Sequence, residues 1–521
     1  AGSTWFVAAA NNGVNCSSGC NSVFGDPISG TAKKVYYRNY TGSWTPPTSG
    51  TLNSDGFFYS RVQVCNVNTA GVLQDSRDYG LCKQYPSGKY KPVGVIQKYS
   101  DQMRLAAFGY LMDPGRYGGV LRAPMKYVGS KTFDINGTDN TPAGGNAAAE
   151  WSATTGVFAT NPDADAMGIS GVINYLNKFG RTGPVPGRYK TYDPVGELHY
   201  ETVRYLQGLE PSAAAISNIT ADMRDGFPVY TSWTDPYGGG RTNTADYACV
   251  KSNIVVVGDT GTHDNRPLPT ANASNNIPDI SYWRGIADKF ERNAGGTYID
   301  GQGNSQTIAN PNPANNSMPG NRIIGSAYWA HTQDIRGAAW SDTAKRRPGL
   351  RVKTFLFDVD ENGDWGRNPT GRSTSNQFVM AAKYGGFETD PTNLGGKPYN
   401  TKGNPFKRQA SPSDVNDNAV WRKSDASGDP LSYYLQSDAR GVLTAFDEIF
   451  GRAASAARSI AGGAASSSSV SSSTAIYTAR FDTSNWSGDV VAEPITSNTT
   501  TFELGFGAPL WSAANMLNTR T

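Results

Sequence analysis

A short apolar run that ends at glycine constrains the fold of this chain more than any other feature. Ile254–Val257 places four β-branched residues in a row, and Gly258 and Asp259 follow at once. Such a run is typical of a strand buried on both faces of a parallel sheet. Ligands of α/β folds bind where such strands end. The run therefore predicts a buried strand of a parallel sheet and raises the question of a site at its carboxyl edge.

Strand-length apolar runs alternate with helical patterns through most of the chain. Runs typical of strands are RVQVC (61–65), LAAFGYLM (105–112), RVKTFLFDVD (351–360) and SYYLQS (432–437). Helical spacing recurs at 169–179, 194–208, 279–290, 322–336, 375–386 and 438–453. Pro194 and Asp279 suit helix starts, and Gly208 and Gly385 suit helix ends. The alternation predicts an α/β fold with a mainly parallel sheet and helices on both faces.

Composition divides the chain into four expected segments. Residues 1–60 are rich in Gly, Ser, Asn and Thr and favour loops or antiparallel β structure, and 61–455 form the α/β region. Residues 456–474 are almost uncharged and contain no aromatic residue, so they predict a linker. Residues 475–521 have strand-like alternation and indicate the start of an all-β domain.

The charge content argues against several classes of function. Only 17% of residues are charged, and the formal net charge is +3, whereas about a quarter are charged in typical soluble proteins. The small charge gives no support to a nucleic-acid or membrane-surface role, and no apolar run is long enough to span a membrane. High contents of Gly, Ser, Thr, Asn and aromatics favour a secreted protein. AGSTWFVAAA (1–10) lacks signal-peptide features, so either a signal has been removed or the chain begins inside a larger precursor, and we expect the second.

Five cysteines are present, and no two form a CxxC pair. With three histidines in the whole chain, a structural zinc site is not favoured. In a secreted chain we expect disulfides between Cys65 and Cys82 and between Cys16 and Cys20. Cys249 is then left as a free thiol, a buried cysteine, or a partner for another chain.

The stretch DVDENGDWG (358–366) is the better of two candidate metal sites. Asp358, Asp360, Asn362 and Asp364 alternate around Gly363, as in the first half of an EF-hand calcium loop. The loop departs from that pattern because Pro369 stands where a bidentate Glu is expected and because it follows a strand. The alternative is a hydrated turn.

Asp259, His263 and Asp264 form a second, weaker metal candidate after the opening strand. An imidazole and two carboxylates within one loop can converge on an ion, with His199 or His331 as a further ligand. The alternative is that the aspartates and the histidine cap their own turn. Glu197 and Glu201 lie one helical turn apart, so the two carboxylates could do acid–base work. A structural role is a sufficient explanation, however, in which Glu201 pairs with Arg204 or Arg204 binds the carbonyl of Gly208.

Six stretches resemble type IV pilus tip proteins of the PilY/PilC type, and they occur in that family's order. They are KQYPSGKYKPVGVIQKY (83–99), GGVLRAPMKYVG (118–129), YDPVGELHYETVRYLQGL (192–209), VVVGDTGTHDN (255–265), GSAYWAHTQDIR (325–336) and YTARFDTSNWSGDV (477–490). The resemblance implies a von Willebrand A-like α/β region followed by the first strands of a modified β-propeller. It also implies a protein at the pilus tip, outside the cell, that rests on minor pilins.

The chemistry of a von Willebrand A adhesion site is mostly missing. Such a site needs Asp-x-Ser-x-Ser, and the nearest strings begin at Asp279 and Asp482 and end wrongly. Asp259 matches one later position, whereas the loop that should supply a Thr reads Asp193-Pro-Val-Gly. We therefore expect a degenerate site.

The sequence favours a non-enzymatic adhesin and assembly factor at the pilus tip. We expect it to act by protein–protein contact with a surface receptor, whose identity the sequence does not indicate, and to bind calcium at the candidate loop. Two alternatives stay open. One is a secreted metal-dependent hydrolase that uses Asp259, His263 and Asp264. The other is a carbohydrate-binding module that uses Trp283 or Trp329.

Overall fold

The computed structural model describes most of the chain after residue 63. The described residues are 64–74, 80–135, 137–180, 190, 192–238, 250–264, 268, 271–272, 276–301, 303–309, 322–337, 340–360, 376–388, 403–406, 418–425, 427–454, 463–465, 475–482, 487–497, 504–506 and 509–518. The chain divides into two compact units, Ala1–Arg61 and Val62–Thr521. The predicted loop-rich segment 1–60 lies outside the described residues.

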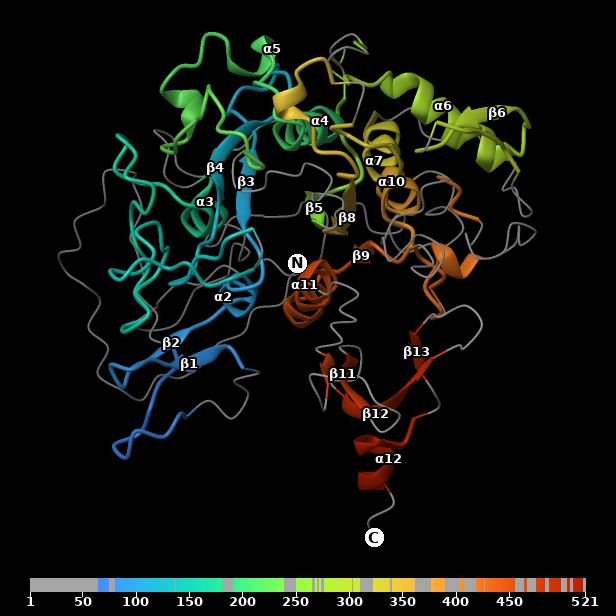
Figure 1. Cartoon of the computed structure of the whole chain (residues 1–521). Coiled ribbons are helices and arrows are strands. Elements are labelled where there is room, and N and C mark those ends of the chain that lie inside the picture. The colour runs from blue at the N-terminus through green and yellow to red at the C-terminus, as the bar shows by residue number, and fades with distance from the viewer. Residues whose placement is uncertain are drawn as a thin grey trace, which may run out of the picture. The chain divides into compact units, whose positions relative to one another are not determined.

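Three strands form a parallel sheet in the order β5–β8–β9 (Figure 1). They are β5 (Ser252–Gly258), β8 (Val352–Asp358) and β9 (Tyr433–Leu435). Gly258 pairs with Asp358, and Asp358 pairs with Leu435, so all three strands end at one edge. The apolar run at 254–257 is confirmed as a strand of a parallel sheet. However, β5 is an outer strand of the described sheet, and Val257 is 56% exposed, so the run is buried only in part.

Helices cover both faces of this sheet, as predicted. On one face Ile254, Val256 and Leu356 join the main core with residues of α4 (Val195–Leu206), α6 (Ile280–Arg292), α7 (Arg322–Thr332) and α10 (Gln377–Gly386). On the other face Phe355 and Phe357 pack with Ile449 of α11 (Ala439–Ala454). The alternation follows from the two-residue period of a strand. Figure 1 shows β5 and β8 between α7 and α10 on one side and α11 on the other.

The other described sheets are antiparallel, so the prediction of a mainly parallel sheet holds only for the central one. Their strands are β1 (Cys82–Gln84) with β2 (Tyr90–Pro92), β3 (Leu105–Gly109) with β4 (Val120–Lys126), and β6 (Thr297–Ile299) with β7 (Ser305–Thr307). The remaining described helical elements are α2 (Val95–Lys98), α3 (Val172–Lys178), α5 (Ala213–Ile216) and the 3-10 turns Asp222–Arg224, Thr343–Lys345 and Asn418–Val420.

A separate antiparallel sheet forms near the carboxyl terminus. Its strands are β10 (Gly463–Ala465), β11 (Ala475–Asp482), β12 (Ser487–Ser497), β13 (Leu504–Phe506) and β14 (Trp511–Ser512), and α12 (Ala513–Asn518) follows. β10 lies within the segment predicted as a linker and pairs with β11. The strand-like alternation after residue 475 is confirmed, whereas membership of a β-propeller stays a prediction.

Two predicted elements differ from the structure. Val64 and Cys65 are not in a strand, because Cys65 has φ of 56°, a left-handed conformation that interrupts an extended run. The helix expected over 169–179 is shorter, as α3 begins at Val172. Its Leu176 is 48% exposed, so the predicted apolar face is only partly buried. No helix in the described part of the chain is long and apolar enough to cross a membrane.

Candidate functional site

The carboxyl edge of the parallel sheet gathers polar side chains from four elements. Gly258 and Asp358 end their strands side by side, so the loop Asp259–Asp264 lies next to the end of β8. The N-termini of α4 and α10 reach the same edge through hydrogen bonds described below. This is the position at which ligands of α/β folds bind.

Asp264 caps helix α4. Its Oδ1 accepts a hydrogen bond from the amide of Gly196 at 2.8 Å. Burial raises the pKa of Asp264, while hydrogen bonds from the backbone of Gly196 and Glu197 lower it. The carboxylate thus places a negative charge at the positive end of the helix. It occupies the position that an external anion would take.

His263 and Asp259 have other partners. His263 Nδ1 lies 2.8 Å from Asp193 Oδ1, and its amide donates to the carbonyl of Asp193 at 3.2 Å. Asp259 Oδ1 accepts from the amide of Gly261 at 2.6 Å. Among the residues that the structure describes, no three His, Cys, Asp or Glu side chains are grouped to hold a metal ion. The fold therefore brings Asp259, His263 and Asp264 to one edge of the sheet. There, each of them is engaged in a turn contact or a helix-cap contact.

Asp358 is held by a buried network. It is 1% exposed, and its Oδ2 accepts from Tyr433 Oη at 2.8 Å and from Asn376 Nδ2 at 3.1 Å. Its Oδ1 accepts from the amide of Asp360 at 3.0 Å. Asn362 and Asp364 lie outside the described residues, so the candidate calcium loop stays a prediction.

Gln377, the first residue of α10, ties this helix to the loop after β5. Its Nε2 donates to the carbonyl of Thr260 at 2.8 Å and to Thr262 Oγ1 at 2.7 Å. Sequence reasoning missed this contact and also the cap that Asn376 provides. The pair Asn-Gln directly before an apolar helix is a recognisable N-terminal signal for the cap, but nothing local indicates which loop Gln377 meets.

The two glutamates of α4 are structural. Glu197 Oε2 accepts from the amide of Gly118 at 2.7 Å, and Glu201 accepts from Tyr117 Oη at 3.2 Å and the amide of Ser212 at 3.1 Å. Burial raises the pKa of Glu201.

Of the two alternative contacts considered for Arg204, the structure has the one with Glu201. Glu201 Oε2 lies 3.9 Å from Arg204 Nε, as expected. However, Arg204 donates to the carbonyl of Glu210 instead of that of Gly208. The carbonyl of Gly208 accepts from Lys345.

The two histidines considered as extra metal ligands are buried in the core. His199 lies between Ser326 Oγ, at 2.8 Å from Nδ1, and Thr354 Oγ1, at 3.1 Å from Nε2. Its burial lowers the pKa to about 3. His331 Nε2 is 2.8 Å from the carbonyl of Phe387, and burial lowers its pKa to about 4. Both act as uncharged core residues.

Trp283 and Trp329 are also core residues. They are 7% and 5% exposed, and both belong to the main apolar cluster. A sugar-binding platform needs exposed aromatic faces, so neither tryptophan can supply one in this fold.

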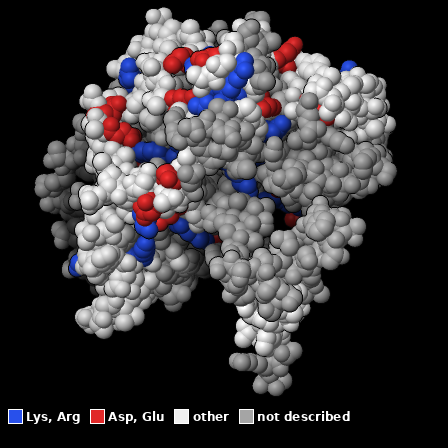
Figure 2. Space-filling view, viewed as in Figure 1, with Lys and Arg blue, Asp and Glu red and all other residues white. Residues whose placement is uncertain are grey.

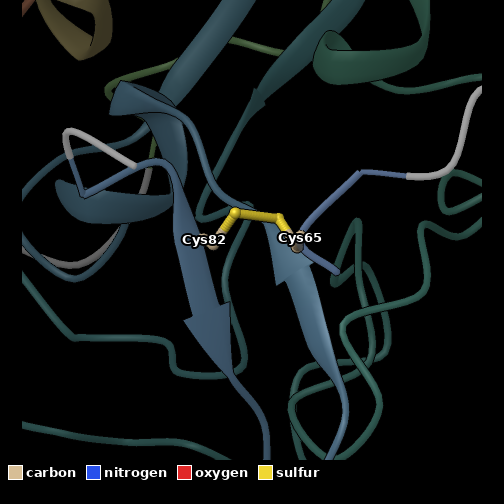
Figure 3. The surroundings of a disulfide bond; sticks show 2 residues. All are labelled: Cys65 and Cys82. Atoms are coloured by element: carbon tan, nitrogen blue, oxygen red, sulfur yellow. A yellow bond between two sulfur atoms is a disulfide. The ribbon is translucent and has the colours of Figure 1, made fainter. Parts of the chain in front are cut away.

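The predicted disulfide between Cys65 and Cys82 is confirmed (Figure 3). The Cα atoms are 5.7 Å apart, and the bond closes a sequence separation of 17 residues. It fastens the segment before β1 to the start of that strand. Cys16, Cys20 and Cys249 lie outside the described residues.

Comparison with known proteins finds relatives of the region that contains the site. A family model described as "PilY1 homolog, second domain" matches residues 115–326, which include α4 and the loop after β5. The chain is 31% identical to a type IV pilus biogenesis factor PilY1 homolog of Xylella fastidiosa, over 93% of this chain and 40% of that protein. A second PilY1 homolog of that bacterium is 24% identical over 41% of this chain and 15% of its own length.

The chain spans about two fifths of the length of the first of these curated relatives. No solved structure gives a significant match. The resemblance found in the sequence is thus confirmed at the level of homology, whereas the von Willebrand A-like plan stays a prediction.

Proposed function

This chain is homologous to PilY1-family proteins of the type IV pilus, and on that premise we propose that it acts in type IV pilus biogenesis through protein–protein contact. The observation that carries the proposal is the 31% identity over 93% of this chain to a protein named as such a factor. The relatives are longer, so the activity of a whole protein is part of the proposal.

The carboxyl edge of the sheet supports a scaffolding role. Asp193, His263, Asp264 and Asp358 each have a hydrogen bond that holds a turn, a helix start or a strand end. A catalytic site would instead direct an acid, a base or a nucleophile toward a substrate. We therefore propose a non-enzymatic protein.

In this proposal the protein lies outside the cell at the pilus tip, rests on minor pilins and contacts a host or abiotic surface. The low charge content of the chain, 17%, suits a surface protein better than a partner for nucleic acid. On the face shown in Figure 2, acidic and basic side chains are interspersed among the described residues. Such a surface favours specific contacts over attraction to a uniformly charged polymer.

The first test is deletion of the coding region in the native bacterium. Surface pili are counted, and attachment is measured per pilus, with re-expression of the deleted gene as the control. Loss of pili that re-expression restores would establish the role in biogenesis. Normal pili with lost attachment would leave an adhesin only, and normal pili with normal attachment would overturn the proposal in favour of the hydrolase.

We also propose a calcium site at Asp358, Asp360, Asn362 and Asp364. It is supported by the alternation of oxygen-bearing side chains around Gly363. Calcium titrated into the protein in a calorimeter should give heat that Asp364→Ala abolishes. Asp259→Ala, which alters the other candidate loop, should leave the heat unchanged. No heat from the unaltered protein would overturn the site.

A further inference from the structure

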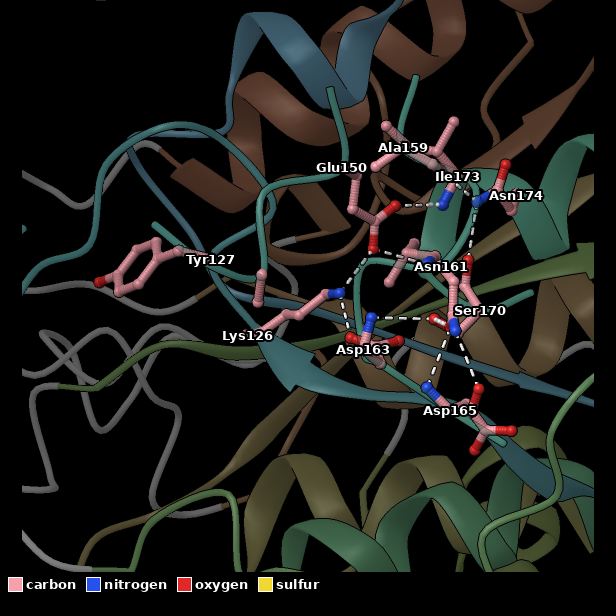
Figure 4. Close-up of polar contacts among 12 residues, drawn as sticks. Lys126, Tyr127, Glu150, Ala159, Asn161, Asp163, Asp165, Ser170, Ile173 and Asn174 are labelled. Carbon is pink, nitrogen blue, oxygen red and sulfur yellow. Dashed lines mark hydrogen bonds and ion pairs between the residues drawn. The ribbon is translucent and has the colours of Figure 1, made fainter. Parts of the chain in front are cut away.

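A lysine lies between two carboxylates beside strand β4. Lys126 is the last residue of that strand, and its Nζ contacts Asp163 Oδ1 and lies 3.1 Å from Glu150 Oε1. The three side chains come from three separate segments and point toward one another (Figure 4). None of them was identified from the sequence, because 24 and 13 residues separate the neighbouring members in the chain.

Water has little access to this group. The side chains of Lys126 and Asp163 are 14% and 11% exposed, and that of Glu150 is fully buried. Asp163 Oδ2 is buried and accepts no hydrogen bond from the residues that the structure describes. Val128, Trp151, Val172 and Ile173 form an apolar cluster from the same segments. Charged groups in such surroundings are costly, so a reaction that removes two opposite charges is favoured.

Asp163 is held in place by the loop that carries it. Its amide donates to Ser170 Oγ at 2.9 Å, and Ser170 Oγ donates to Asn161 Oδ1 at 2.7 Å. The side chain of Asn161 also binds the backbone of Asp165. Its Oδ1 accepts from the amide of Asp165 at 3.0 Å, and its Nδ2 donates to the carbonyl of Asp165 at 2.8 Å. Figure 4 shows this loop closed around Ser170. Fixed geometry of this kind gives two reactive groups a high effective concentration.

Glu150 is fixed from the other side. Its two oxygens accept from the amides of Val172 and Ile173, both at 2.7 Å. The carboxylate is thus kept beside Lys126 Nζ, within reach for proton transfer. A nucleophile, an acceptor carboxyl and a nearby base are the parts that amide formation needs.

We infer that Lys126 and Asp163 form an intramolecular isopeptide bond, with Glu150 carrying the protons. Glu150 takes a proton from the Lys126 ammonium, and the resulting amine attacks Asp163 Cγ to form the N–C bond. The second amine proton that must leave, together with the one held by Glu150, goes to an oxygen of Asp163. The C–O bond breaks and one water departs. An ammonium and a carboxylate thus become a neutral amide and water, with no oxidant or reductant required.

The bond would join β4 to the loop before α3. It would resist reducing agents, in contrast to the disulfide between Cys65 and Cys82. Such a cross-link suits a protein that bears load, but its existence does not depend on the proposed function, because it is tested on the purified chain alone.

Mass spectrometry of the full chain, reduced and unfolded, tests the inference. We expect the intact mass to be lower than the sequence mass by one water, about 18 Da. Trypsin should not cut after Lys126, and a branched peptide should join Lys126 to Asp163. Lys126→Arg keeps the positive charge but removes the nucleophile, so it should restore the full mass. Glu150→Gln should leave a mixture with less cross-linked chain.

Two other ion pairs serve as internal controls in the same peptide map. Lys98 Nζ and Asp447 Oδ1 are 2.6 Å apart, but both side chains are about half exposed. Lys383 Nζ and Glu291 Oε1 are 2.6 Å apart and buried, but no second carboxylate among the described residues forms an ion pair with Lys383. Neither should be joined. Full mass with cleavage after Lys126 in folded protein would overturn the inference. So would loss of water that persists in Lys126→Arg, because that indicates a succinimide at an aspartate. If a variant fails to fold, the peptide map of the unaltered chain decides.

Discussion

Gly196 shows how a single residue sets the geometry of the sheet edge. A Cβ at this position would lie 2.6 Å from Asp264 Oδ2 and 3.0 Å from the amide nitrogen of Ile323. The absence of a side chain therefore allows Asp264 to reach the first turn of α4 and allows α7 to approach it. By contrast, a Cβ at Gly285, within α6, would meet nothing within 4 Å.

Alanine at these two helical glycines should have opposite effects. Gly196→Ala should lower the free energy of unfolding by about 1–3 kcal/mol, since an extra methyl group is forced into packed surroundings. Gly285→Ala should raise it by about 0.5–1 kcal/mol, because alanine loses less backbone entropy in a helix. Urea unfolding of both variants measures the difference. Equal effects would contradict the contact between Asp264 and α4.

The buried histidines predict a loss of stability in acid. The unfolded chain binds a proton at His199 near pH 6.5, whereas burial keeps the folded residue neutral until about 3. Stability is therefore present in full above pH 6.5 and falls below it, by about 1.4 kcal/mol per pH unit for each such histidine. His331, with a folded pKa of about 4, acts in the same direction.

His199→Gln should make the stability less dependent on pH. Between pH 6.5 and 4, the slope of unfolding free energy against pH should fall by the equivalent of about one proton. Glutamine retains groups that can hydrogen-bond to Ser326 and Thr354. The slope is measured from urea unfolding at several pH values, and an unchanged slope would show that His199 is protonated in the folded state.

At the scale of elements, the residues that cap the helix starts differ in how many parts of the fold they join. Asp279 accepts from the amide of Tyr282 at 3.0 Å and serves only α6. Asn376 Oδ1 accepts from the amides of Phe378 and Val379, at 2.8 and 3.1 Å, while its Nδ2 donates to Asp358. Asn376 thus joins the start of α10 to the end of β8.

Removing the two caps should therefore have unequal costs. Asp279→Ala should lower the free energy of unfolding by about 1 kcal/mol, the usual value for a helix cap. Asn376→Ala should cost about 2–3 kcal/mol, because it also removes a donor to the buried carboxylate of Asp358. Chemical denaturation of the two variants side by side gives the comparison. A cost for Asn376→Ala no greater than that for Asp279→Ala would count against the link to β8.

At the scale of the whole molecule, α2, which follows the disulfide and strands β1 and β2 in the chain, contacts α11 of the parallel-sheet region. Tyr99 and Phe450 have ring centroids 6.0 Å apart, and Tyr99 Oη donates to the carbonyl of Asp447 at 3.3 Å. Lys98 Nζ lies 2.6 Å from Asp447 Oδ1. The side chains of this ion pair are about half exposed, so the pair stabilises the contact only weakly.

Loss of the disulfide should consequently destabilise the region of β1 and β2 more than the parallel sheet. We expect Cys65→Ser with Cys82→Ser to reduce stability by about 3 kcal/mol, from the loop-closure entropy of a loop of this length. Amide hydrogen exchange should show faster exchange in β1 and β2, with little change in β5 and β8. Equal acceleration in both regions would show that they unfold together.

The sequence determined the elements whose signals are local. Ile254–Val257 indicates a strand, because four β-branched residues in a row suit a pleated backbone. Its burial was not determined in the same way, since Val257 is 56% exposed. Asp279 and the apolar residues Trp283, Ile286 and Phe290 defined α6 for the same kind of reason, namely a cap followed by a period of 3.6 residues. The homology to pilus proteins was also visible in local stretches.

Only the tertiary structure decided which side chains meet. Asp264 and Gly196 are 68 residues apart, and Lys126 and Asp163 are 37 apart. Nothing in the spacing of such pairs indicates contact, since their approach depends on how strands pair and helices pack. In the expected strand RVQVC, the described residues Val64 and Cys65 are not in a strand, because Cys65 adopts a left-handed conformation that the alternation did not indicate. Local periodicity is encoded within a few residues, whereas contacts are set by the packing of the whole fold.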